Sequence, residues 1–462
     1  MRRRASALYW DPELDARPWA DVQRWQGAQI GPVLRRVQSE SEFYRERFQG
    51  FDFERLFSFE SLTRLPFTTK DELRVGQQHR SAGRPLGDQQ ARPLKSLVQM
   101  VSSSGTSGQP VLYGLTQRDV VRWADCIANM FYTAGVRPGD VVVHLTSLPM
   151  VAGGLPFADG LRRVGAALAW MGGYPPERVL AQLPAMQASV LSATTSHCVY
   201  LTEHCESLIG ALPSSRGIRR IIGGGEPGLA QPDLREKLRL AWAASDLREI
   251  MGLSDVVAGM WAECSDESGM HFTASRHVAI ELIDPTTGEQ LAWQDGTTGE
   301  VVYTALDREA TPLVRFRSGD QVVVTSVNCA CGRTAPKIRC IGRTDDMLIY
   351  KGMNVFPTAI RDVILTTGGS ALAPHVRVWR TYPGQVRFDE PIRVEVEAIA
   401  PDSEGRTALR TSIEDAVRKS LQVRIDVSIV DPGTLPRSSY KASLLYTPEE
   451  SRDGDTAIPQ PR

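Results

Sequence analysis

The stretch SSSGTSGQP, residues 102–110, joins two apolar runs at residues 97–101 and 111–115, and the first run has the composition of a strand. Its glycines let a ligand approach the backbone closely, and its hydroxyl and N–H groups are donors for phosphate oxygens. It is not a Walker A loop, because no Gly-Lys-Ser/Thr follows its glycines and position 109 is Gln. The stretch therefore predicts another kind of polyphosphate cradle, with a solvated loop as the alternative.

Outward from this loop, short β-rich runs alternate with longer amphipathic stretches between residues 98 and 323. The β-rich runs include residues 141–145, 219–222 and 300–304, and the amphipathic stretches include residues 234–243. This alternation predicts α/β layers with mostly parallel strands. Residues 20–75 space their apolar side chains as helices do. We therefore expect a helical segment that leads into an α/β domain.

The chain changes character near residues 341–351, which are charged and contain glycine. About a hundred residues follow, which is enough for a small domain. Residues 391–398 alternate as a strand does, and residues 411–421 have the spacing of a helix. The polar residues 448–462 have almost nothing to bury. These features predict a small α+β domain after a hinge, followed by a disordered tail.

The composition excludes several classes of protein. With 462 residues, 42% hydrophobic and 23% charged, the chain is typical of a soluble protein of at least two domains. Its 53 Lys and Arg against 54 Asp and Glu give no global field for nucleic acid or an anionic membrane. No stretch reads as a signal peptide or a membrane span, so we expect a cytoplasmic protein. Seven unevenly spaced cysteines do not suggest a disulfide framework.

Five further motifs follow the loop in a fixed order along the chain. They are GGEP at residues 224–227, MGLSD at 251–255, RSGD at 317–320, GRTDD at 342–346 and LPRSSYK at 435–441. Together with the loop they resemble the acyl-adenylate-forming superfamily over nearly the whole chain. LPFTTK at residues 65–70 and the run at 347–357 resemble its phenylacetate-CoA ligase-like branch in particular. One such motif is a weak signal, but several in order are a strong one.

The resemblance implies both a fold and a reaction. It implies a large, multi-layered α/β adenylation domain, residues 1–343, and a small α+β C-terminal domain, residues 344–447, which rotates about a hinge. A carboxylate attacks the α-phosphate of ATP to give an acyl-adenylate and pyrophosphate, and the thiol of coenzyme A then displaces AMP. The expected function is therefore an AMP-forming acid–thiol ligase.

The resemblance also assigns the ATP site. The residues that would hold the β- and γ-phosphates are Ser103, Ser104, Gly105, Thr106, Ser107 and Gly108. Those that would border the nucleotide are Gly225, Glu226, Pro227, Met251, Gly252, Asp320 and Arg343. Asp320 would accept both ribose hydroxyls, because a carboxylate is an acceptor-only group, although alone it would be read as a surface-turn residue. Met251 stands where the family has Tyr against adenine, and a thioether still packs on an aromatic face.

Other matched positions have charged side chains or lie at the expected hinge. Asp255 stands where the family places a magnesium-binding Glu, and carboxylate oxygens are ligands that Mg²⁺ prefers beside phosphates. Lys441 would be the adenylation catalyst, stabilising charge that develops on the α-phosphate. Arg343 and Asp345 match the hinge. Lys351 would lie near the coenzyme A tunnel, with an ordinary exposed lysine as the alternative.

Four sulfur and imidazole side chains form two short pairs. Cys264 and His271 lie in a hairpin-like stretch, and Cys329 and Cys331 form a tight turn with Gly332. Four such ligands are what a tetrahedral structural Zn²⁺ needs. Buried thiols and a hydrogen-bonded histidine are the alternative, because the two pairs lie far apart in sequence. The remaining cysteines are expected to be packing residues.

The resemblance places an acid pocket among small and apolar residues. Those expected to line it are Met150, Gly154, Met171, Gly172, His197, Gly223 and Gly224. Glycines beside methionines leave a flat apolar slot, which favours an aromatic acid over a long chain. His197 would hydrogen-bond a ring substituent, or else cap local backbone as a structural histidine.

Two alternative functions stay open at this stage. One keeps adenylation but transfers the acyl group to a carrier-protein thiol or to an amine. The other is a non-catalytic homologue that only binds a nucleotide, because Met251, Asp255 and Gln109 depart from the family pattern. The sequence leaves open the acid, the acceptor and the oligomeric state, for which a homodimer is one expectation.

Overall fold

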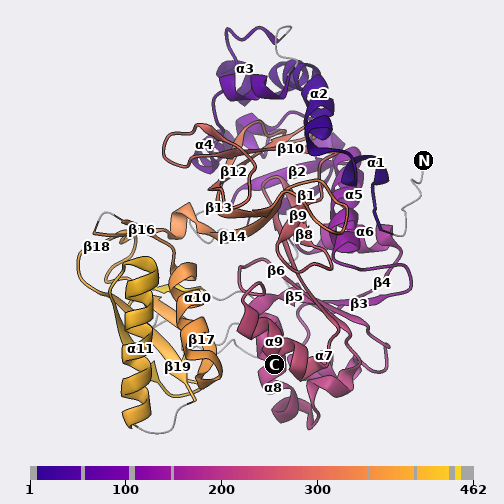
Figure 1. The fold of residues 1–462 in the computed structure, drawn as a ribbon. Helices are drawn as coiled ribbons and strands as arrows, with labels where there is room; N and C mark the ends of the chain where they lie inside the picture. The colour runs from indigo at the N-terminus through magenta and orange to yellow at the C-terminus, as the bar shows by residue number, and fades with distance from the viewer. Residues whose placement is uncertain are drawn as a thin grey trace.

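A computed structural model describes residues 8–53, 58–103, 110–146, 150–351, 353–399, 403–435 and 443–448 (Figure 1). Its main feature is a twelve-stranded sheet in the order β11-β10-β12-β13-β14-β9-β8-β7-β6-β5-β3-β4. The strands are β3 (Val141–His144), β4 (Ala167–Trp170), β5 (Val190–Thr194), β6 (Arg220–Gly224), β7 (Asp246–Leu253), β8 (Val257–Glu263), β9 (Met270–Phe272), β10 (Val278–Ile283), β11 (Gln290–Leu291), β12 (Thr298–Ala305), β13 (Phe316–Ser326) and β14 (Lys337–Arg343).

The sheet is parallel only from β4 to β7, and every pairing from β7 to β11 is antiparallel. Helices connect the parallel strands: α6 (Leu155–Val164), α7 (Pro176–Gln182), α8 (Thr195–Ile209) and α9 (Pro232–Trp242). The expectation of mostly parallel strands is therefore wrong for the larger part of the sheet. There the strands follow one another with no long helix between them, and only a long crossover allows parallel pairing.

Two apolar cores cover the two faces of the parallel half. Neighbouring strand residues alternate between them, as Val142 and Val143 do on β3. One core contains α5 (Gln117–Thr133) and α6, and the other contains α7, α8 and α9. Burial on both faces explains the continuous apolar runs in these strands. The predicted strands at residues 141–145 and 219–222 and the helix at 234–243 are confirmed.

The N-terminal part is helical, as expected, with α1 (Pro12–Asp15), α2 (Trp19–Glu40), α3 (Glu42–Arg47) and α4 (Lys70–Gly76). A capping box fixes the start of α4, because Thr69 accepts from the Glu72 N–H and the Glu72 carboxylate accepts from the Thr69 N–H. β1 (Leu97–Ser102) and β2 (Leu112–Thr116) pair as an antiparallel hairpin, and residues 104–109 between them lie outside the described residues.

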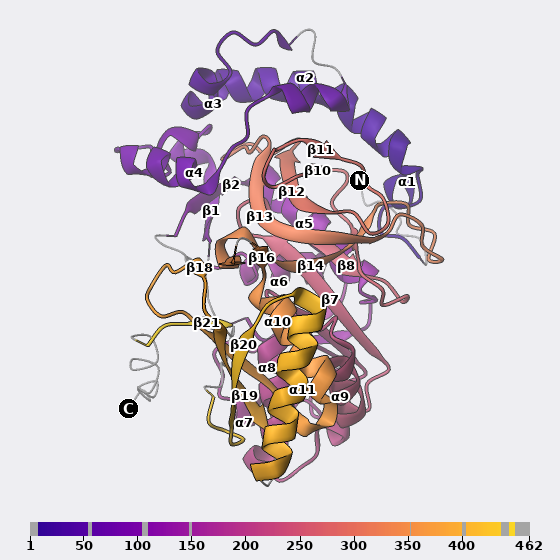
Figure 2. The ribbon, with the colours of Figure 1, turned by 60° about the vertical axis from the view of Figure 1, so that its left-hand side comes forward.

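The C-terminal part has a separate core, all of whose members lie between Leu348 and Leu445. One small sheet contains β15 (Leu348–Tyr350), β16 (Met353–Val355) and β18 (Arg387–Phe388). A second sheet, in the order β20-β19-β17-β21, contains β17 (Leu372–Trp379), β19 (Ile392–Ala398), β20 (Ile425–Val430) and β21 (Leu445–Tyr446). The helices are α10 (Pro357–Gly368) and α11 (Ser403–Leu421). This part lies beside the parallel half of the large sheet, away from the N-terminal helices (Figures 1 and 2).

Among the described helices, none combines the length and the apolar content that crossing a bilayer requires.

Candidate active site

A cavity of about 810 Å³ lies where the parallel half of the large sheet meets the C-terminal part. Its walls include the carboxyl ends of β5, β6 and β7, the first turns of α8, and residues of α10, β17 and β21. Ligands of α/β sheets commonly bind at the carboxyl ends of the parallel strands. The cavity is therefore the candidate active site.

The cavity brings together residues of every described motif. The predicted residues on its wall are Ser103, Gly224, Gly225, Glu226, Pro227, Met251, Gly252, Asp255, Asp320 and Arg343. Gly252 has no alternative there, because a Cβ atom would lie 2.0 Å from the carbonyl oxygen of Ala258. The series of motifs that the sequence shows in order thus surrounds one space.

The GGEP loop, residues 224–227, is held from two sides. Glu226 Oε1 accepts the N–H of Ser196 at 2.6 Å, at the first turn of α8. Carboxylates are stabilised at such a helix N-terminus. From the C-terminal part, Arg361 Nη1 on α10 donates to the carbonyl oxygen of Pro227 at 3.0 Å. The loop is therefore fixed between α8 and the C-terminal part.

Asp320 and Arg343 face each other across neighbouring strands. They are register partners on β13 and β14, and Arg343 Nη1 donates to Asp320 Oδ1 at 2.8 Å. The Asp320 N–H also donates to Ser318 Oγ at 3.0 Å. The ion pair orients a buried carboxylate at the cavity wall, where it can accept hydroxyl groups.

Asp255 lies in a charged cluster that the sequence did not reveal. Lys70 Nζ, at the start of α4, lies 3.3 Å from Asp255 Oδ1, and the Tyr113 hydroxyl donates to the same oxygen. Burial and the Asp255 charge raise the pKa of Tyr113 well above its ordinary value, so the phenol stays protonated as a donor. Tyr113 lies on β2, opposite Val101 of the hairpin, so the cluster is tied to the glycine-rich stretch.

The other end of the cavity is apolar and aromatic. Phe157 and His144 line it with ring centroids 5.6 Å apart, together with Val151, Val199 and Ala193. His144 Nε2 lies 2.8 Å from the Gly153 carbonyl oxygen, and burial lowers its pKa to about 4. The imidazole is therefore neutral at physiological pH. This end can hold an uncharged ring.

Most of the residues predicted for the acid pocket lie elsewhere. Met150, Gly154, Met171, Gly172, His197 and Gly223 are not among the described residues that line the cavity. Met171 belongs to the core of α7, α8 and α9, and the ring of His197 stacks on Tyr200. Ser196, Val199 and Tyr200 share one face of α8 at helical spacing and do line the cavity, whereas His197 is one residue out of phase.

Several residues of the cavity wall are not predicted from the sequence. Glu249 lies two residues before Met251 on β7 and so on the same face of the strand, a signal that period-two spacing could have given. Burial, and next the charge of Glu263, raise the pKa of Glu249 to about 7. Arg361 and His375 reach the cavity from the C-terminal part, which no local pattern reveals.

Some predicted residues lie outside the described part of the chain, namely Ser104, Gly105, Thr106, Ser107, Gly108 and Lys441. Asp345 lies in the short 3-10 turn Thr344–Asp346 that follows β14. Lys351 is exposed in the turn between β15 and β16, with Nζ 5.7 Å from the Tyr350 ring, and it is not among the residues that line the cavity. All these roles stay predictions.

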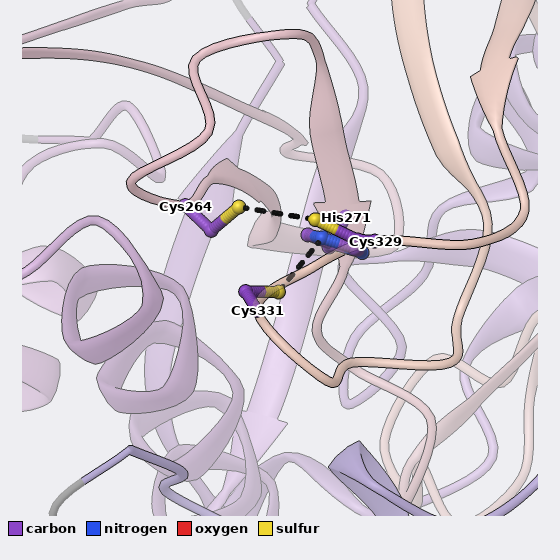
Figure 3. Close-up of side chains that lie close together, drawn as sticks. All are labelled: Cys264, His271, Cys329 and Cys331. Carbon is purple, nitrogen blue, oxygen red and sulfur yellow. Dashed lines mark hydrogen bonds between the residues drawn. The ribbon is translucent and has the colours of Figure 1, made fainter.

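The four Cys and His side chains lie close together (Figure 3), and none of them is among the described residues that line the cavity. One ligand atom from each of Cys264, His271, Cys329 and Cys331 lies within 4.8 Å of all the others. Cys264 Sγ and Cys329 Sγ are 3.7 Å apart, and Cys331 Sγ lies 3.4 Å from His271 Nε2. A disulfide needs a distance of about 2.05 Å, so these thiols are not bonded to each other.

The distances in this cluster fit a tetrahedral metal. Zinc bonds of about 2.3 Å to sulfur and about 2.1 Å to nitrogen give tetrahedral edges of about 3.8 Å and about 3.6 Å. His271 Nδ1 lies 3.0 Å from the Ala335 carbonyl oxygen, a contact that leaves Nε2 free to bind a metal. Lys337 Nζ lies 3.7 Å from Cys329 Sγ and supplies a compensating positive charge. The donor set therefore suits a structural Zn²⁺.

Comparison with known proteins gives the family. Residues 352–446 match the model of the AMP-binding enzyme C-terminal domain. The phenylacetate-coenzyme A ligase of Pseudomonas putida is 31% identical over 407 residues, which cover 87% of this chain and 89% of that one. The chain belongs to the phenylacetate-coenzyme A ligase family. The ligase of the same name from Escherichia coli (strain K12) is 29% identical and covers 92% of this chain and 94% of its own.

Solved structures agree with this membership in the phenylacetate-coenzyme A ligase family. A 2-hydroxyisobutyryl-CoA ligase in the postadenylation state, in complex with 2-HIB-AMP, is 25% identical, with a TM-score of 0.87 over 97% of this chain and 94% of that one. In its thioesterification state, with coenzyme A, the TM-score is 0.68 over 96% and 92%. The predicted family and fold class are confirmed, and the two parts of this chain are arranged more as in the postadenylation state.

Proposed function

We propose that this enzyme activates an aromatic carboxylic acid in the cavity between its two parts. Family membership makes it an ATP-dependent, AMP-forming acid–CoA ligase that works through an acyl-adenylate. The observation that supports an aromatic acid is the neutral apolar end of the cavity, with Phe157 and His144 side by side. Flat rings fill such a slot better than flexible chains do.

The charged wall residues account for the first step. A carboxylate oxygen attacks the α-phosphorus of ATP, the bond to the bridging oxygen breaks, and pyrophosphate leaves. Lys70 offers positive charge beside the hairpin that carries the predicted phosphate loop. Lys441 is the proposed catalyst at the α-phosphate, where positioned charge is commonly worth on the order of a hundredfold in rate. Asp320 is the proposed acceptor for the ribose hydroxyls.

Asp255 is the proposed protein ligand for Mg²⁺. Its carboxylate lines the cavity, and Mg²⁺ usually takes one or two carboxylates together with substrate phosphates. Lys70 and Tyr113 already contact this carboxylate, which favours a contact through water. When bound, the ion would neutralise charge on the leaving pyrophosphate.

In the second step the thiol of coenzyme A attacks the acyl carbon and AMP leaves. We propose that the C-terminal part turns about Asp345 between the two steps and that Lys351 then faces the phosphates of coenzyme A. Transfer to a carrier-protein thiol or an amine is the alternative for the acceptor. Mass spectrometry of the product, with free coenzyme A and with a carrier protein, tests this point.

The Cys/His cluster is the proposed site of a structural Zn²⁺. Four ligands close a tetrahedral site and leave no open position, which is typical of structural zinc rather than catalytic zinc. Elemental analysis of the purified enzyme tests this proposal. One zinc per chain is expected, and protein without bound metal would contradict it.

A screen of acids by pyrophosphate release tests the choice of acid. The panel contains phenylacetate, benzoate, hydroxybenzoates, aminobenzoates and 2-hydroxyisobutyrate, each with and without coenzyme A. We expect an aryl acid to give the highest kcat/KM, and Phe157→Ala to lower that value more for aryl acids than for 2-hydroxyisobutyrate. Faster turnover of 2-hydroxyisobutyrate than of every aryl acid would overturn the proposal.

A further inference from the structure

A contact between the two parts of the molecule lies at the edge of the cavity. His375 on β17 places Nε2 3.2 Å from Glu203 Oε2 on α8, and Lys237 Nζ on α9 lies 3.0 Å from Glu203 Oε1. The side chains of His375 and Glu203 are only 19% and 18% exposed. Glu203 thus links His375 of the C-terminal part to Lys237 on α9, which packs on the large sheet.

The carboxylate in this contact is ionised at all physiological pH values. Burial alone would raise the pKa of Glu203, but the hydrogen bond to His375 and the charge of Lys237 lower it to about 2. Arg361, Arg377 and Arg380 of the C-terminal part line the same cavity edge. Within that part, Arg361 also pairs with Asp362 and Arg377 with Glu395. Glu203 is therefore the acceptor that this cationic edge meets on α8.

The contact is mechanically linked to the segment of the proposed catalyst. β17 carries His375 and pairs with β21, with Val378 opposite Leu445. Residues 443–446 line the cavity and follow Lys441 in the chain, with one residue between. Because paired strands move together, seating β17 on α8 also fixes the strand that follows Lys441. The Arg361 contact with Pro227 is a second anchor of the same orientation.

We propose that His375 and Glu203 are positioning residues that hold the C-terminal part in the orientation for adenylation. This rests on the proposed function, in which the same part turns between the half-reactions. The arrangement seen here is the one more similar to the postadenylation state, with a TM-score of 0.87 against 0.68 for the thioesterification state. The pair therefore speeds the first half-reaction and must break before the second.

The expected effect has opposite signs in the two half-reactions. A partly buried hydrogen-bonded pair that favours one orientation shifts its population by about threefold to tenfold. His375→Ala and Glu203→Gln should lower acid-dependent ATP–pyrophosphate exchange by about that factor. Thioester formation from synthetic acyl-adenylate and coenzyme A should stay equal or rise. Loss of fold would lower both rates, so the split separates positioning from a structural role.

The test measures both half-reactions with the acid that the wild type exchanges fastest in the screen. Arg410→Ala is the matched control, because the described ion pairs of Arg410 are with Glu414 and Asp426, both within the C-terminal part. The double variant His375→Ala with Glu203→Gln should be no slower than the worse single variant. Equal exchange rates in the wild type and the variants, or equal losses in both half-reactions, would overturn the proposal.

A second measurement needs no substrate. Fluorescent labels on exposed Glu236 of α9 and Ser412 of α11 report the distance between the two parts. His375→Ala should broaden or lengthen that distance distribution, and Arg410→Ala should not. An unchanged distribution in His375→Ala would contradict the proposal. Failure of the proposed function would give a different result: the wild type itself would show no pyrophosphate exchange with any acid of the panel.

Discussion

The Cys/His cluster and the adenylate cavity are assembled in opposite ways. All four residues of the cluster come from one domain, and their atoms already stand at the distances of a tetrahedral site. The walls of the cavity come from two parts of the chain, which meet through contacts such as Arg361 with Pro227 and His375 with Glu203. Folding of the large domain completes the first site. The second also requires the small domain to be in place.

This difference predicts two kinds of failure. Damage to the cluster should change stability, because a structural metal contributes to the free energy of folding. Damage at the cavity should change rates more than it changes stability, because the residues there are the ones proposed to contact ATP and the acid.

Replacing two thiols of the cluster should cost the most. Cys329→Ser combined with Cys331→Ser removes two of four ligands, and we expect loss of bound zinc and about 3 kcal/mol or more of stability. Elemental analysis and thermal unfolding measure these effects. Cys205→Ala, a thiol outside the cluster, is the control and should keep one zinc per chain. An unchanged Tm in the double variant would contradict the claim that the cluster stabilises the fold.

Lys441→Ala should leave stability unchanged and lower acid-dependent pyrophosphate release by on the order of a hundredfold or more. The reason is that a positioned ammonium acts only as charge develops on the α-phosphate. Pyrophosphate release measures the expected loss of rate, and thermal unfolding of the same preparation measures the expected unchanged stability. Lys351→Ala is the control, expected to slow thioester formation and spare adenylation. Full activity of Lys441→Ala would remove the proposed catalyst.

The large domain should lose stability at alkaline pH through His277. Burial alone would lower its pKa, but Asp125 and Asp307 raise it to about 9. His277 Nδ1 lies 2.7 Å from Asp307 Oδ2. Its contribution is therefore fully present below the ordinary pKa of about 6.5 and is lost as pH rises towards about 9.

Unfolding from pH 6 to pH 10 measures this contribution, which is up to about 3 kcal/mol from the size of the pKa shift. His277→Gln should flatten the alkaline part of the stability curve. If the wild type and His277→Gln lost stability in parallel, the charged histidine would not be the cause.

The smallest effect is expected where the cavity departs from its family. Met251→Tyr places an aromatic ring at the proposed adenine wall, and ring stacking is worth about 0.5–1.5 kcal/mol. KM for ATP should fall about twofold to tenfold, with KM for the acid unchanged. A rise in KM for ATP would show that the thioether is adapted to this wall.

The sequence predicts those features that depend on local pattern or on scarce chemistry. The runs at residues 141–145 and 234–243 become β3 and α9 because burial imposes their spacing. The Cys/His cluster is predictable although its pairs are far apart, because few residue types can fill a tetrahedral site. The order of motifs likewise places Asp320 and Arg343 on one wall, where they pair.

Other features depend on contacts that no local pattern encodes. The partnership of Lys70 with Asp255 joins residues 185 positions apart. His197 follows the wall residue Ser196 by one position, which turns its side chain by about 100° around the helix, and it is not among the described residues that line the cavity. The contacts of Arg361 and His375 depend on how the small domain sits against the large one. A sequence read alone has no access to that orientation.

The most direct test of the account is acid-dependent ATP–pyrophosphate exchange without coenzyme A, followed by coenzyme A addition and mass analysis. The account predicts exchange that requires an aryl acid, then one acyl-CoA and one AMP for each ATP consumed. Binding of ATP with no exchange in the presence of any acid of the panel would contradict it.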